Sequence, residues 1–120
     1  MTLQECYAAM GGNYEEVLGR LRSDRLIQKF VLKFVDDGSY QLLLDSMASQ
    51  NYEDAFRAAH TIKGVCQNLG LTRLLNSSSQ LSEALRHGYT PEADGRVEQV
   101  GTDYQETIGA IRAFQASLGA

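Results

Sequence analysis

Two histidines occur in the sequence, and the residues around His60 are of types that favour phosphate chemistry. Lys63, Gly64 and Gln67 follow at spacings that place them on the His60 face of a helix. A neutral imidazole is a nucleophile, and most unperturbed imidazole is neutral at pH 7. A phosphoryl group bound to the ring would be negative, so Lys63 could neutralise part of its charge and Gln67 could hydrogen-bond its oxygens. The spacing therefore favours an imidazole that accepts a phosphoryl group.

The His60 face is expected to be exposed, because the opposite face of a helix over residues 52 to 69 is apolar. The apolar residues on that opposite face are Ala55, Ala58, Ile62, Val65, Cys66 and Leu69. Glycine inside a helix costs roughly 1 kcal/mol relative to alanine, and Gly64 leaves room beside His60 for another protein. Phe56, one turn before His60, is interpreted as part of an apolar docking patch. We expect His60 to be at least half exposed, with the apolar face buried behind it.

The segment from Ala59 to Gly70, A-H-T-I-K-G-V-C-Q-N-L-G, resembles the signature of histidine-containing phosphotransfer (HPt) domains, A-H-x-[LI]-K-G-x-x-x-x-[LIF]-G. The resemblance implies an all-α fold, an up-and-down four-helix bundle with additional short N-terminal helices. It implies that His60 is phosphorylated, with Lys63 on the phosphate side and Gly64 giving clearance. Gln67 occupies a polar position that varies in the family. The implied partners are receiver domains of response regulators and a sensor or hybrid histidine kinase.

The helix after Gly70 is expected to run antiparallel to the His60 helix, because the connection between them is brief. Counting outward from the turn places the level of His60 near Leu81 and Ser82. Some family members present a glutamine near the phosphorylated ring from this helix, and Ser82 is not glutamine, so that hydrogen bond is not carried over. Ser82 and Arg86, one turn further on, are taken as candidate contacts with a partner.

The expected function is phosphoryl transfer without a cofactor. An aspartyl phosphate on a receiver passes its phosphoryl group to His60, which returns it to another receiver aspartate, and the metal ion for this chemistry belongs to the receiver. No G-x-x-x-x-G-K-[ST] motif occurs, so we expect a carrier without its own ATP-dependent kinase activity, not a complete enzyme. Cys6 and Cys66 lie too far apart in sequence to form a metal-ligand motif, and no metal site is expected.

Other interpretations remain open. The chain could be a docking module that binds a response regulator and inhibits or scaffolds it without carrying phosphate. It could also accept phosphate from a kinase and mainly drain it from one regulator. An enzyme that uses His60 as a general base is a third alternative, which we rank last because no carboxylate lies one turn away on the same face to orient the ring.

A chain of 120 residues fits one domain. Apolar residues recur at spacings of three and four residues throughout the chain, which is typical of helices. The alternation of apolar and polar residues that is typical of strands is missing. We expect helices over residues 3–10, 14–21, 24–36, 40–49, 52–69, 72–87 and 91–118. Thr2, Asn13 and Asn51 are expected to cap helix starts. The glycines at 11, 38, 70 and 88 are expected to close helices in the left-handed conformation.

The last helix is expected to bury a long apolar stripe, with Gly101 and Gly109 allowing close helix approach. The stripe consists of Val97, Val100, Tyr104, Ile108, Ile111 and Leu118.

The net charge of −4 argues against nucleic acid as a partner, because binding to its backbone needs a positive field. No apolar stretch is long enough to span a membrane, and no secretory signal is visible, so we expect a cytoplasmic protein. We also expect it to be a monomer.

Overall fold

The computed structural model describes residues 1–119 and is all-α. This part of the chain forms seven helices: α1 (Leu3–Met10), α2 (Tyr14–Leu21), α3 (Asp24–Phe34), α4 (Ser39–Ala48), α5 (Tyr52–Leu69), α6 (Thr72–Leu85) and α7 (Glu92–Leu118). Every expected helix is present, and α3 and α6 end two residues earlier than expected. The all-α prediction is confirmed.

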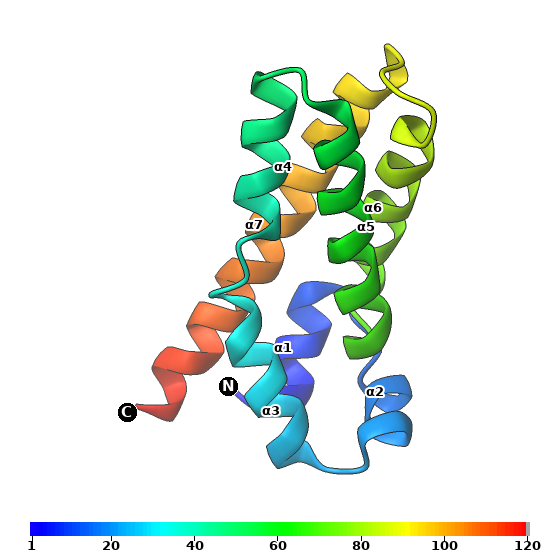
Figure 1. Ribbon diagram of the computed structural model, residues 1–120. Coiled ribbons are helices and arrows are strands. Elements are labelled where there is room, and N and C mark those ends of the chain that lie inside the picture. Colours follow the sequence, from blue (N-terminus) through cyan, green and yellow to red (C-terminus); the bar gives the residue numbers. More distant parts are fainter. Residues whose placement is uncertain (120) are drawn as a thin grey trace.

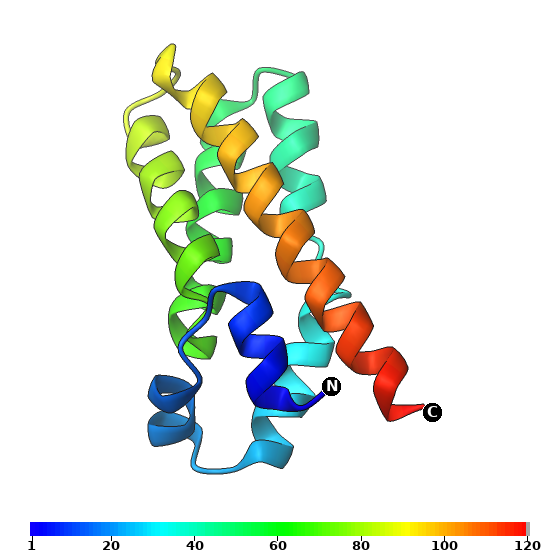
Figure 2. The ribbon, with the colours of Figure 1, turned by 180° about the vertical axis from the view of Figure 1, so that it is seen from behind.

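Helices α4 to α7 form an up-and-down four-helix bundle (Figures 1 and 2). Along the chain, α4 packs on α5, α5 on α6, and α6 on α7. Stacking of the Tyr40 and Tyr104 rings, whose centroids lie 4.0 Å apart, joins α4 to α7 and closes the bundle. At its lower end in Figure 1, α3 lies end to end with α4, and α1 packs along the second half of α7. The short N-terminal helices therefore cover the end of the bundle where α5 finishes.

The capping predictions hold at the three polar starts. Thr2 and Glu5 form a reciprocal capping box at α1. The side chains of Asn13 and Asn51 accept hydrogen bonds from backbone N–H groups in the first turns of α2 and α5. The prediction for Gly38 was wrong: with φ of −86° it precedes α4 and is not left-handed. The expected left-handed closure does occur at Gly70, where φ is +67°.

The prediction that the apolar stripe of α7 ends at Leu118 was wrong. Leu118 is 47% exposed, and Phe114 is buried instead. The last turn of α7 projects away from the neighbouring helices (Figure 2), and Leu118 in this turn is only partly covered. Gly101 lies close to α4, since a Cβ added there would lie 2.9 Å from the Tyr40 hydroxyl oxygen. Gly109 is exposed, and no neighbouring helix approaches it.

Within residues 1–119, no helix is both long and apolar enough to cross a membrane.

Candidate functional site

His60 lies in the middle of α5, and its side chain is exposed as the helical wheel predicts. Behind it, Ile62 and Leu69 are buried and belong to the core of the bundle. Val65 was expected to be buried as well, but it is only half-buried. The reason is that Val65 borders an open groove between α5 and α3.

Gly64 faces open space, one turn after His60. A Cβ built on it would have no neighbouring atom within 4 Å, and the residue is exposed. No crossing helix therefore requires a glycine here, although glycine weakens a helix interior. The space next to the imidazole is available to a second molecule.

The side chains of Lys63 and Gln67 are not engaged by other parts of residues 1–119. Neither forms a hydrogen bond there, and the Lys63 ammonium has no ion-pair partner. Lys63 is half-buried and Gln67 is exposed. Both groups are consequently available to bind an anion on the exposed side of α5.

Phe56 and His60 stack on the surface of α5. Their ring centroids are 5.9 Å apart and the rings are inclined by 20°. The Arg86 guanidinium carbon lies 5.7 Å from the Phe56 ring centroid, a cation–π arrangement, and Arg86 also pairs with Glu83 at 3.0 Å. The structure thus places Arg86, which follows the last residue of α6, next to the aromatic neighbour of His60, and this makes a small apolar and cationic surface beside the imidazole.

Ser82 does not reach this surface, so its prediction as a partner contact was wrong. The antiparallel count was sound, since Phe56 meets Arg86 and Ser82 is four residues before Arg86. The side chain of Ser82 nevertheless points into the bundle, where it is 1% exposed and its hydroxyl oxygen has no hydrogen-bond partner among the described residues. Counting residues from the turn predicts which residues of α5 and α6 lie at the same height. The direction in which the Ser82 side chain points depends instead on the rotation of α6 about its own axis.

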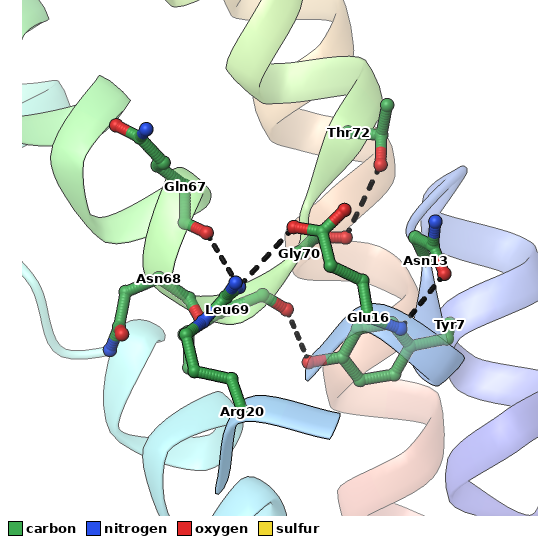
Figure 3. Close-up of polar contacts among 9 residues, drawn as sticks. All are labelled: Tyr7, Asn13, Glu16, Arg20, Gln67, Asn68, Leu69, Gly70 and Thr72. Carbon is green, nitrogen blue, oxygen red and sulfur yellow. Dashed lines mark hydrogen bonds and ion pairs between the residues drawn. The ribbon is translucent and has the colours of Figure 1, made fainter. Parts of the chain in front are cut away.

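The N-terminal segment clamps the C-terminal end of α5 (Figure 3). Arg20 of α2 donates hydrogen bonds from Nη2 to the backbone oxygens of Gln67 and Asn68, each at 2.8 Å. The Tyr7 hydroxyl donates to the backbone oxygen of Leu69 at 2.7 Å. The backbone N–H of Asn13 donates to the backbone oxygen of Gly70 at 2.8 Å. These bonds satisfy carbonyls that every helix leaves unpaired at its end.

This clamp was missed in the sequence because its partners are far apart along the chain. Arg20 lies 47 and 48 residues before the carbonyls it binds, and Tyr7 lies 62 residues before Leu69. The one signal available was an absence: the last turn of α5 contains no basic residue. Helices often have a basic side chain in the last turn that binds the free carbonyls. A last turn without one indicates that another element of the fold binds these carbonyls.

The two cysteines do not compete with His60 as nucleophiles. Both are buried free thiols. Burial raises the pKa of Cys6 to about 11 and that of Cys66 to about 12, so both stay protonated at neutral pH. In residues 1–119, no three His, Cys, Asp or Glu side chains are grouped so that they could hold a metal ion.

The family model of the Hpt domain matches residues 15–114. The chain belongs to the Hpt domain family. No curated protein and no solved structure matches it. Hpt domains are phosphoryl carriers in phosphorelays, not kinases, and they interact with receiver domains and histidine kinases. In this Hpt domain, α1 and the loop that follows it precede the matched residues, although Tyr7 and Asn13 bind the end of the helix that carries His60.

Proposed function

We propose that His60 accepts a phosphoryl group from an aspartyl phosphate on a receiver domain and returns it to a receiver aspartate. The observation that carries this proposal is the exposed imidazole next to the open space at Gly64. A receiver must bring its aspartate into contact with the ring, and a side chain at position 64 would obstruct that approach. The membership in the Hpt domain family supports the same conclusion.

The chemistry requires little of this chain beyond positioning. One ring nitrogen of His60 attacks the phosphorus in line while the bond from phosphorus to the aspartate oxygen breaks, so the aspartate leaves as a carboxylate. The transition state is loose, and charge stabilisation dominates. The unengaged Lys63 ammonium can neutralise part of the phosphoryl charge, and the Gln67 amide can donate a hydrogen bond to its oxygens.

The chain acts as a carrier without ATP-dependent kinase activity. Its sequence contains no Walker-type nucleotide motif. Its net charge of −4 disfavours nucleic acid as a partner. Two free buried thiols fit the reducing cytoplasm.

A phosphotransfer screen tests the proposal. Purified, phosphorylated receiver domains from the same genome are mixed with the wild-type chain, with His60→Gln and with His87→Gln. His87 is the second histidine and is also exposed, so it is the matched control. We expect label on the wild-type chain and on His87→Gln, and none on His60→Gln. A receiver that binds the wild-type chain while no receiver labels it would instead indicate a docking module.

A further inference from the structure

Positive charge is concentrated in one segment of this acidic chain. Residues 20–33 contain five of the eleven Lys and Arg residues but only one of the fifteen Asp and Glu residues, Asp24. The carboxylate of Asp24 accepts a hydrogen bond from the Tyr14 hydroxyl. The end of α2 and the whole of α3 therefore form a local positive region on a protein whose net charge is −4.

Three of these cations form a cationic stripe along α3, which we define as Arg25, Lys29 and Lys33. They recur every four residues, so they share one face of the helix, and all three are exposed. None of them has an ion-pair or hydrogen-bond partner within residues 1–119. Five arginines outside α3 each form an ion pair: Arg20, Arg57, Arg73, Arg86 and Arg96. No ion pair within the described residues thus neutralises the charge of the stripe.

A groove with apolar and charged lining residues connects the stripe to the helix that carries His60. The groove has a volume of about 440 Å³ and lies between α3 and α5. Phe30 and Lys33 line it from α3, and Val65 and Asn68 line it from α5. Asp36 and Asp37, which follow α3, also line it, so within the groove itself Lys33 is the cation beside two carboxylates. Lys33 belongs both to the groove and to the stripe. The surface therefore continues from α5 to the cations of α3.

The dimensions place this groove within reach of a partner centred on His60. Asn68, which lines the edge of the groove nearest to the His60 face, follows His60 by eight residues, which is about 12 Å along a helix and roughly a quarter turn around it. A standard interface covers roughly 800 Å² on each partner, equivalent to a disc of about 16 Å radius. Such an interface reaches Asn68, at the edge of the groove that Lys33 also lines, whereas Lys29 and Arg25 lie about 6 Å and 12 Å beyond Lys33 along α3.

We propose that the receiver that docks over His60 also covers the α3–α5 groove and presents a carboxylate-rich surface to the cationic stripe. This inference rests on the proposed function. An acidic partner would be repelled by the net negative charge of this chain, and the stripe supplies the local attraction that offsets this. Charges of this kind steer association and fix orientation more than they add affinity.

The test compares charge reversals along the stripe with one at the other end of the molecule. Lys33→Glu, Lys29→Glu and Arg25→Glu are made singly, and Arg96→Glu is the control with the same change in net charge. Arg96 lies in the first turns of α7, at the opposite end of the bundle from α3 (Figure 2). Melting curves and Lys33→Gln, which only removes the charge, separate a docking effect from a folding effect.

We expect the loss of receiver binding to decrease from Lys33 to Lys29 to Arg25. For a receiver that labels the wild-type chain, Lys33→Glu should weaken binding about tenfold, because its charge lies inside the interface. Lys33→Gln should weaken binding less. Lys29→Glu and Arg25→Glu should mainly slow association, in decreasing order, since screening reduces interactions beyond about 8 Å at physiological salt. These differences should shrink at high salt, and Arg96→Glu should bind like the wild-type chain.

Two results would overturn the inference. One is that all four charge reversals bind the receiver with the affinity and salt dependence of the wild-type chain while transfer to His60 proceeds normally, which leaves the proposed function intact. The other is that the stripe variants lose binding to vesicles of anionic phospholipid but keep receiver binding, which would assign the stripe to a membrane. Failure of every receiver to label the wild-type chain would count against the proposed function itself.

Discussion

Gly64 and Lys63 are neighbours in sequence, yet the structure gives them different surroundings. Gly64 is exposed and its missing side chain leaves open space, whereas Lys63 is half-buried with an ammonium that has no partner in residues 1–119. In the proposed mechanism, Gly64 governs access to His60 and Lys63 provides positive charge. Substitutions at the two positions should therefore affect different steps of the reaction.

Gly64→Gln should raise stability while it impairs docking. Glutamine is the better helix former by roughly 0.5–1 kcal/mol, but its side chain fills the approach to His60, so receiver binding and transfer both fall. Gly109→Gln is the matched control, because Gly109 is another exposed helical glycine with open space around it. It should gain similar stability and keep normal transfer. Calorimetric titration and melting curves of both variants decide the matter.

Lys63→Ala should leave docking of the unphosphorylated chain largely unchanged. It should slow transfer or shorten the lifetime of the phosphohistidine, because a charge-assisted contact to the phosphoryl oxygens is lost. The rate of transfer and the decay of label measure this. If Lys63→Ala and Gly64→Gln lost docking to the same extent, the two residues would not have separate roles.

Phe56→Ala tests whether the surface beside His60 binds the receiver. Phe56 is half-buried and stacks between His60 and Arg86. Truncation of a central interface aromatic should raise the dissociation constant about tenfold, equivalent to about 1.4 kcal/mol. Partial burial means that the melting temperature should fall modestly. Leu118→Ala is the control, because it removes an exposed apolar side chain far from His60, and this variant should bind the receiver normally. If Phe56→Ala melted at a much lower temperature but bound the receiver normally, Phe56 would be a core residue and not part of the docking surface.

At the scale of helices, α5 is fixed at its two ends in different ways: a neighbouring residue caps its start, and elements far away in sequence bind its end. Its start depends on a local cap, because the Asn51 side chain accepts a hydrogen bond from the backbone N–H of Asp54. Its end depends on α1 and α2, through Tyr7, Asn13 and Arg20. The last turn of α5 contains Gln67, so the clamp also fixes the backbone of a proposed phosphate-binding residue.

Arg20→Ala should loosen this end of α5. Charge-assisted hydrogen bonds contribute on the order of 1–3 kcal/mol, and partial exposure of Arg20 places the expected loss near the lower limit, about 1 kcal/mol. A melting temperature lower by about 4 °C follows. Hydrogen exchange should accelerate in the last turn of α5 more than at its start. Arg22→Ala is the control, since Arg22 is exposed and forms no ion pair in the described part of the chain. If hydrogen exchange in the last turn of α5 were equally slow in both variants, Arg20 would not hold this end of the helix.

The sequence predicted what depends on nearby residues. Helix boundaries follow from caps and apolar spacing, and the exposure of His60 follows from the period of α5. Contacts between distant elements were not predictable in this way. The Arg20 clamp and the inward direction of Ser82 depend on how helices rotate and meet in space, which spacing along one helix does not determine.

At the scale of the whole molecule, α1 is an integral part of the fold although it precedes the residues that match the Hpt family model. It packs against α7 and contributes four buried side chains to the core, those of Leu3, Cys6, Tyr7 and Met10. It also supplies the Tyr7 hydroxyl that binds the end of α5. One short helix therefore connects the last helix of the bundle to the helix that carries His60.

Removal of residues 1–12 should abolish cooperative folding. Full burial of a large apolar side chain stabilises by roughly 1.5–3 kcal/mol, so losing the α1 contribution approaches the 5–15 kcal/mol that typically separates folded from unfolded domains. The shortened chain should show reduced helical circular dichroism, a broad melt and no phosphotransfer. The control variant ends at Ser117, since Leu118 is exposed, and it should melt and accept phosphate normally. A chain without residues 1–12 that melted sharply and accepted phosphate at the wild-type rate would show that residues 15–114 suffice, and that α1 only adds to a bundle that is complete without it.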